Sequence, residues 1–87
     1  MDVPEISRFH GIVVAMFYPE HGTAHFHARH GAYKIKLDIG TGGVSGEFPP
    51  SALRRVMAWA AIHQHELLEN WRRARLGEPL RRIAPLE

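Results

Sequence analysis

The stretch HGTAHFHARHGAYKIKLD, residues 21–38, decides the fold, because its pattern predicts a β-hairpin in one register. A two-residue turn at Gly31-Ala32 pairs His30 with Tyr33 and, at the far end, His25 with Asp38. Side chains alternate between the two faces of a strand. The apolar face then carries Phe26, Ala28, His30, Tyr33, Ile35, Leu37 and Ile39. The polar face carries His25, His27, Arg29, Lys34, Lys36 and Asp38. A slip by one residue would mix the two sets, so we predict this register.

The segments on either side of the hairpin have the patterns of further strands and of a helix. Residues 4–9 are interpreted as a short lead-in, and residues 11–18 as a strand that is apolar on both faces and therefore covered on both. The hairpin strands span about 24–30 and 33–39, and residues 44–48 are a candidate fourth strand. Pro49-Pro50 open a helix over about 50–76, which Gly77 and Pro79 end. An extended tail follows at 78–87.

These elements predict one α+β domain over residues 1–87, a three- or four-stranded antiparallel β-meander packed on one long C-terminal α-helix. Such a helix would measure about 39 Å at ~1.5 Å per residue, which is long for so small a sheet. A bend near residues 63–65 is the alternative. Trp59 and Ile62 lie off the apolar stripe of the helix, which predicts a further contact. We expect the C-terminal tail to make that contact, and a partner protein is the second candidate.

The composition excludes several classes of protein. The chain has no cysteine, which excludes disulfides and thiolate zinc sites and fits a reducing compartment. Residues 1–9 lack the apolar core of a signal peptide, and the longest apolar run, residues 12–18, is too short to span a membrane. We expect a cytoplasmic protein without a membrane partner. A domain of 87 residues is only marginally stable alone, so a homodimer or a partner protein would add stability.

The motif His25-Phe26-His27 suggests a metal site, because it places two imidazoles on one face of a strand. A zinc ion that does chemistry needs a third protein ligand and an open position. His21 and His10 are candidates for that ligand. Lys36 faces His27 in the register and disfavours a cation there. We therefore expect no cofactor, and a divalent metal such as zinc at His21, His25 and His27 is the alternative.

The same polar face permits chemistry without a metal. His25 opposite Asp38 would form a general acid–base pair, with His27 beside it. The candidate catalytic residues are therefore His25, His27 and Asp38. Three cations on this face would bind the phosphates of RNA: Arg29, Lys34 and Lys36. Because the alternative is an ordinary solvent-exposed strand face, whether the protein is an enzyme stays open.

The remaining histidines give weaker signals. His30 falls on the apolar face beside Tyr33, which predicts a hydrogen-bonded histidine at the edge of the core. His63 and His65 do not share a helix face and make a poor joint metal site.

Residues spread over nearly the whole chain match the motifs P-x-I-S-x-F-x-G-I, H-F-H, P-P-x-x-L and L-L-x-x-W. They are Pro4, Ile6, Ser7, Phe9, Gly11, Ile12, His21, His25, Phe26, His27, Gly31, Pro49, Pro50, Leu53, Trp59, Leu67, Leu68, Asn70 and Trp71. On these residues the sequence resembles a family of small prokaryotic proteins classed as a domain of unknown function. Two positions depart from it: Thr23-Ala24 stands where the family usually has Pro-Pro, and Glu20 where it often has Asp.

Members of that family are often encoded beside another small protein regarded as an antitoxin. The resemblance therefore implies a toxin–antitoxin role, with this chain as the toxin. From the residues of the polar face, we expect such a toxin to act on RNA or on the translation machinery. Two alternatives remain from the residues themselves. One is a non-catalytic protein-interaction module built on Trp59, Ile62 and the tail, and the other is the histidine-based metal-binding domain.

Overall fold

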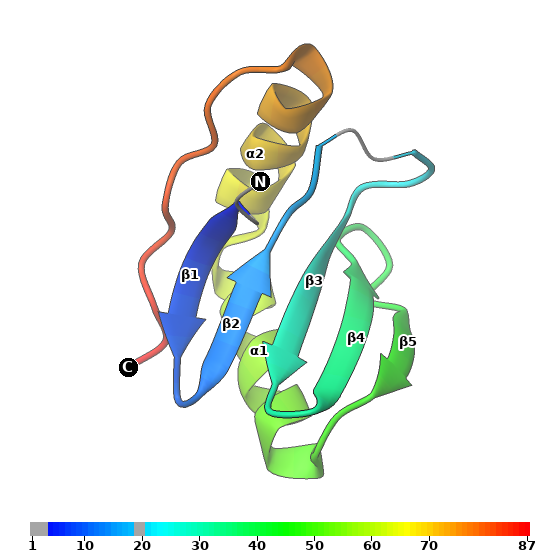
Figure 1. Cartoon of the computed structure of the whole chain (residues 1–87), viewed down its shortest axis with the longest axis vertical. Coiled ribbons are helices and arrows are strands. Elements are labelled where there is room, and N and C mark those ends of the chain that lie inside the picture. Colours follow the sequence, from blue (N-terminus) through cyan, green and yellow to red (C-terminus); the bar gives the residue numbers. More distant parts are fainter. Residues whose placement is uncertain (1–3, 19–20) are drawn as a thin grey trace.

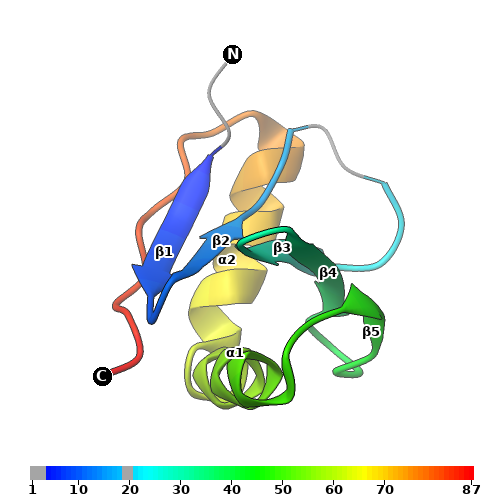
Figure 2. The ribbon, with the colours of Figure 1, turned by 60° about the horizontal axis from the view of Figure 1, so that its bottom comes forward.

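The computed structural model describes residues 4–18 and 21–87, which form an α+β domain of two layers. A five-stranded antiparallel sheet lies over two helices, as Figures 1 and 2 show. The strands are β1 (Glu5–Phe9), β2 (Ile12–Ala15), β3 (His25–His30), β4 (Tyr33–Asp38) and β5 (Val44–Glu47), and their order in the sheet is their order in the chain. The helices are α1 (Pro50–Ile62) and α2 (Gln64–Leu76), and the tail returns along β1.

The predicted register of the hairpin is confirmed pair for pair, from His25 opposite Asp38 to His30 opposite Tyr33. Gly31 has a φ of +60°, which suits the first central position of a type II′ turn. The separation by polarity follows from the register: the side chains of Phe26, Ala28, Ile35, Leu37 and Ile39 are buried in the core. The hairpin is therefore the central part of the sheet.

The meander has one strand more than the sequence predicted, because residues 5–9 are not a lead-in but form β1. A two-residue turn at His10-Gly11 joins β1 to β2, with φ values of +50° and +75°. Both central residues of a type I′ turn need a positive φ, and histidine is one of the few residues besides glycine enriched there. The candidate strand at 44–48 is confirmed as β5, and β2 is shorter than the predicted 11–18. Of the turn interpreted at residues 19–22, residues 19–20 lie outside the described part.

A single long helix over residues 50–76 is wrong, and the chain breaks where the alternative placed a bend. His63 has φ −109° and ψ 27° between α1 and α2, and its ring Nδ1 contacts the Glu66 carboxylate at 2.5 Å. A straight helix of about 39 Å would exceed the longest dimension of the molecule, 34 Å. The break turns α2 away from the axis of α1, as Figure 2 shows, so that Val56 and Leu67 both reach the core.

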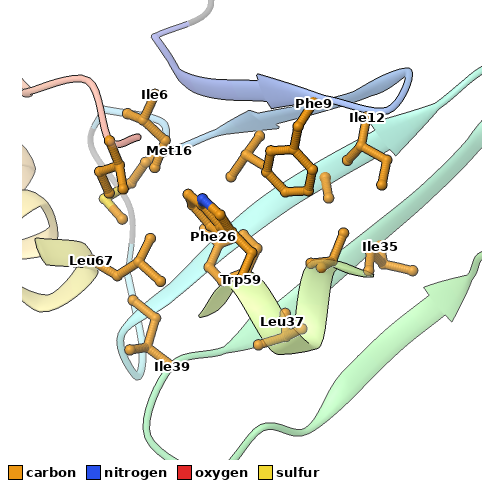
Figure 3. Packing of buried hydrophobic residues seen from close by; sticks show 14 of the residues in the cluster. Ile6, Phe9, Ile12, Met16, Phe26, Ile35, Leu37, Ile39, Trp59 and Leu67 are labelled. Atoms are coloured by element: carbon orange, nitrogen blue, oxygen red, sulfur yellow. The ribbon is translucent and has the colours of Figure 1, made fainter. Parts of the chain in front are cut away.

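The core is centred on Trp59, which is fully buried between α1 and the sheet (Figure 3). Its ring centroid lies 5.4 Å from that of Phe9 and 5.8 Å from that of Phe26. The indole Nε1 donates a hydrogen bond to the backbone carbonyl of Ala84 at 2.8 Å. The contact predicted for Trp59 is thus made by the chain's own tail, whereas Ile62 remains 68% exposed. A partner therefore cannot use Trp59 in the way that the interaction-module hypothesis requires.

The tail is held by polar contacts as well as by burial of Ile83. The backbone N–H of Ile83 donates to the carbonyl of Ile6 at 2.8 Å, and the Ser7 hydroxyl donates to the carbonyl of Ile83 at 3.0 Å. The buried amide of Asn70 donates to the carbonyl of Arg81 at 2.8 Å and accepts from its N–H at 2.9 Å. The tail therefore closes the core beside the edge strand β1 and does not cover the second face of β2.

We expect Gly46→Ala to separate β5 from the sheet. Gly46 has a φ of +101°, and a Cβ there would lie 2.4 Å from the backbone carbonyl oxygen of Lys34. Because β5 is an exposed edge strand, it can detach while the rest of the sheet stays folded. We therefore expect the free energy of unfolding to fall by only about 2 kcal/mol. Chemical denaturation gives the free energy, and faster amide exchange in β4 reports the separation. Gly42→Ala is the control, because Gly42 also has a positive φ but open space around it, and it should lose only about 1 kcal/mol. Equal effects of the two changes would contradict a role for the close approach.

Candidate functional site

The face of the sheet turned away from the helices, here called the open face, carries rows of side chains set by the strand register. Arg29 of β3 lies between Val13 of β2 and Lys34 of β4, and Lys34 lies opposite Glu47 of β5. Within residues 4–18 and 21–87, both helices and the tail leave this face uncovered, as Figures 1 and 2 show. The expected cover on the second face of the first apolar strand is therefore not supplied by the described chain.

A hollow of about 270 Å³ lies on the open face. Its apolar part is formed by Val13, Ala15 and Phe17, and the side chains of His27, Arg29, Lys34 and Glu5 surround it. We call this the open-face pocket. It brings together three of the predicted site residues, His27, Arg29 and Lys34. Lys36 is exposed in the neighbouring row, opposite His27.

Sequence reasoning missed the apolar part of the pocket. The available signal was the run at residues 11–18, which is apolar on both faces: Val14 and Met16 enter the core, while Val13 and Phe17 remain half-buried on the other side. A second apolar surface is typical of packing under a cover, although an uncovered surface is equally compatible with the pattern. Glu5 was missed because it belongs to the unpredicted strand β1.

The register places His25 on the polar side of the hairpin, but His25 is only 5% exposed, so the six polar residues do not form one exposed face. The β2–β3 ladder ends at Ala15 opposite His27, and beyond that point the ring of Trp71 contacts His25 with centroids 5.0 Å apart. The Nδ1 of His25 lies 2.8 Å from the carbonyl oxygen of Thr23. A carbonyl only accepts, so Nδ1 carries a hydrogen and donates this bond.

The carboxylate of Asp38 orders two loops. Its Oδ1 accepts hydrogen bonds from the backbone N–H groups of Gly40 at 2.9 Å and Thr41 at 2.8 Å, and its Oδ2 accepts from the Thr23 hydroxyl at 2.6 Å. These bonds, that from Thr23 first, lower the pKa of Asp38 to about 2. Thr23 thus connects the two members of the predicted acid–base pair, since its carbonyl accepts from His25 and its hydroxyl donates to Asp38.

We expect the protein to lose stability as the pH falls from about 4.5 to about 2. Hydrogen bonds from Arg8 and Arg82 lower the pKa of Glu5 to about 2, as the Thr23 and loop bonds do for Asp38. A carboxyl group with a lowered pKa in the folded state stabilises the fold above its unfolded pKa and loses that effect as it is protonated. Asp38→Asn should therefore lower the denaturation midpoint at pH 7 and reduce its further fall in acid. Glu47→Gln on β5 controls for the removal of one carboxylate. An Asp38→Asn variant whose denaturation midpoint matches that of the wild type both at pH 7 and in acid would contradict this account.

The other histidines occupy separate places. His30 is half-buried, its Nδ1 bonds the carbonyl of Gly11 at 3.1 Å, and its ring packs on Phe48, which confirms the hydrogen-bonded residue predicted at the core edge. His21 is exposed in the loop before β3. Among residues 4–18 and 21–87, no three His, Asp or Glu side chains are placed to hold a metal ion together, so His21, His25 and His27 do not form a ligand set there.

In the described part of the chain, neither helix is both long and apolar enough to cross a membrane.

Comparison with known proteins identifies one family. No curated protein and no solved structure matches the chain. The model of a family described as a domain of unknown function, DUF4160, matches residues 11–72. This range runs from the turn before β2 into α2 and includes the whole hairpin and most of the open-face pocket, whereas β1 and the tail lie outside it. Because the match covers most of the 87 residues, the chain belongs to the DUF4160 family.

Proposed function

We propose that the open face binds RNA and that the protein acts through this binding as the toxin of a toxin–antitoxin pair. The observation that carries the RNA-binding part is the open-face pocket, in which an apolar surface lies beside the side chains of Arg29 and Lys34. Phosphate groups need cations, whereas bases need apolar or aromatic surface, and a single face that offers both suits a nucleic acid.

The positions of the cations support this proposal. Arg29 and Lys34 are directly opposite one another on β3 and β4, and both are exposed. Adjacent strands lie about 4.8 Å apart, so the sheet holds the two side chains close enough to contact neighbouring phosphates. Lys36 adds a third cation one row away. Glu47 lies opposite Lys34 and weakens the field there, so we expect moderate affinity that depends on salt.

The proposal is for binding and includes no catalytic step. Asp38 already accepts three hydrogen bonds that order the loops around it, and His25 is buried against Trp71. Neither residue lines the open-face pocket. His27 lines the open-face pocket, and its ring packs on that of Phe17.

Binding of a short single-stranded RNA, followed by fluorescence anisotropy, tests the proposal. We expect the double change Arg29→Gln and Lys34→Gln to weaken binding at least about tenfold, because hydrogen bonds to charged groups are worth about 1.5–3 kcal/mol each. The slope of log K against log salt concentration should fall by about 1.4, because each phosphate that is no longer neutralised removes about 0.7 from the slope for a single strand.

The matched control is the double change Arg54→Gln and Arg55→Gln, which removes the same charge from exposed positions on α1. It should leave binding nearly unchanged. Glu47→Gln should tighten binding, because it removes the carboxylate opposite Lys34. Equally weakened binding in the two double variants would assign the binding to net charge and overturn the role of the open face.

The toxin role has a separate test. Expression of the wild-type chain should stop growth, the Arg29→Gln and Lys34→Gln variant should not, and co-expression of the protein encoded beside it should restore growth. RNA recovered bound to the wild-type chain should keep its full length. Shortened RNA would instead support catalysis by His25 and His27, and unimpaired growth with the wild-type chain would overturn the toxin role while leaving RNA binding to its own test.

A further inference from the structure

We propose that the open-face pocket takes one unpaired base stacked on Phe17, so that the RNA bound is single-stranded. This inference rests on the proposed RNA binding and names the form of RNA that the same face accepts. Three features carry it: the aromatic ring in the pocket, the size of the pocket and the two cations that line it.

Phe17 offers an aromatic surface on the open face. The residue is half-buried, and its ring meets that of His27 at 4.6 Å between centroids and 72° between planes. This edge-to-face contact fixes the orientation of the Phe17 ring before any ligand binds. Beside it, Val13 and Ala15 are small, so they provide an apolar surface without filling the pocket. Stacking on an aromatic side chain accepts every base, because every base has a π-face.

The size of the pocket suits one small group such as a single base. Its volume of about 270 Å³ is just below the ~300 Å³ at which pockets for drug-sized ligands begin. The rest of an RNA chain must therefore lie outside the pocket, across the exposed cations. A base that is paired and stacked in a duplex cannot enter, because A-form RNA presents only the edges of its bases.

The cations that line the pocket provide a position for the phosphate of the bound nucleotide. Glu5 on β1 lies on one side, where its carboxylate binds Arg8 at 2.7 Å and Arg82 at 3.0 Å. These two arginines lower its pKa to about 2, and the pairing with two guanidinium groups means that Glu5 does not make this side of the pocket negative. Arg29 and Lys34 are on the other side, two and three strands away, or about 10–14 Å at the usual strand spacing. The exposed side chains of Arg29 and Lys34 line the pocket on β3 and β4, so we expect the phosphate of the bound nucleotide there.

The test uses an eight-nucleotide RNA with one 2-aminopurine, whose fluorescence falls when the base stacks. We expect Phe17→Ala to weaken binding by about 5- to 100-fold, the range for removal of one stacking partner, and to abolish the change in 2-aminopurine fluorescence. The salt dependence should remain that of the wild type, because the cations that neutralise phosphate are unchanged. Phe17→Tyr should bind normally. Val13→Ala is the matched control, since it removes apolar atoms from the same pocket without removing a ring. Thermal melting confirms that each variant is folded.

The outcomes separate this inference from the proposed function. If Phe17→Ala binds RNA as tightly as the wild type while the Arg29→Gln and Lys34→Gln variant does not, the base pocket is overturned and RNA binding stands. Equal affinity for the same RNA in a duplex also overturns the base pocket. AMP distinguishes a free nucleotide from RNA: binding of AMP that depends on Phe17, with no binding of RNA, would keep the pocket and overturn the RNA-binding proposal.

Discussion

Trp59→Ala is expected to lower the free energy of unfolding by about 3–5 kcal/mol, the range for removal of a buried aromatic side chain. Trp59 is fully buried, and its ring packs on Phe9 from β1 and Phe26 from β3. Trp59 thereby connects α1 with the sheet (Figure 3) and, through its bond to Ala84, with the tail. Because the free energy of unfolding of a small domain is about 5–15 kcal/mol in total, the variant should be marginally folded. Urea denaturation followed by circular dichroism measures the decrease.

Trp59→Phe separates packing from hydrogen bonding. The variant keeps an aromatic ring against Phe9 and Phe26 but has no N–H to donate to the carbonyl of Ala84. We expect the free energy of unfolding to fall by about 1 kcal/mol from the missing hydrogen bond, together with a smaller decrease from packing. If Trp59→Phe were as unstable as Trp59→Ala, the hydrogen bond to the tail, and not the packing of the ring, would be the main contribution of this residue.

Removal of residues 79–87 is expected to unfold the domain or to lower its free energy of unfolding by more than about 3 kcal/mol. The truncation exposes the apolar surface that Ile83 covers and removes the bond partner of Trp59. It also leaves the buried side chains of Asn70 and Ser7 without the tail groups they now bind. Each hydrogen bond lost to water costs about 0.5–1.5 kcal/mol, and the newly exposed apolar surface adds to the loss. Circular dichroism and the thermal midpoint measure the effect.

The control for the truncation keeps the backbone of the tail and changes only its charges. Arg81→Gln with Arg82→Gln removes the exposed ion pair between Arg82 and Glu5 but leaves the bonds of Asn70 and Ser7 to the tail backbone. Exposed ion pairs contribute about 0–1 kcal/mol, so this variant should be nearly as stable as the wild type. A truncated chain with wild-type stability would show that the tail packs without stabilising the fold.

Elements that are formed by interactions between residues close in the sequence were predicted best. The hairpin was predicted to the residue, because its turn and its alternation of polar and apolar side chains are local. The strand β1 had only a weak local signal, the dipeptide His10-Gly11, because histidine adopts a positive φ less readily than glycine does. The helix break could be placed near residue 63 but not decided, because an apolar stripe has the same spacing in one long helix and in two short ones.

The candidate site was predictable in part for the same reason. The register alone placed His27, Arg29, Lys34 and Lys36 on one face, and that grouping holds in the structure. The register could not show that Trp71 from α2 covers His25, or that Phe17 and Glu5 lie beside Arg29. These contacts join segments distant in the chain, and they exist only once the helices and β1 have packed.

The sequence by itself determined the α+β class, the β3–β4 register with its polar face, and membership of the DUF4160 family. Each of these depends on the order of residues along short segments. The tertiary structure alone decided that Asp38 orders the loops around Thr23 and Gly40, that the tail closes the core over Trp59, and that one face of the sheet stays open. The physical reason is that burial and hydrogen-bond partners are properties of packed surfaces, and a strand face with histidines and lysines looks the same in sequence whether it is covered, exposed or hollowed.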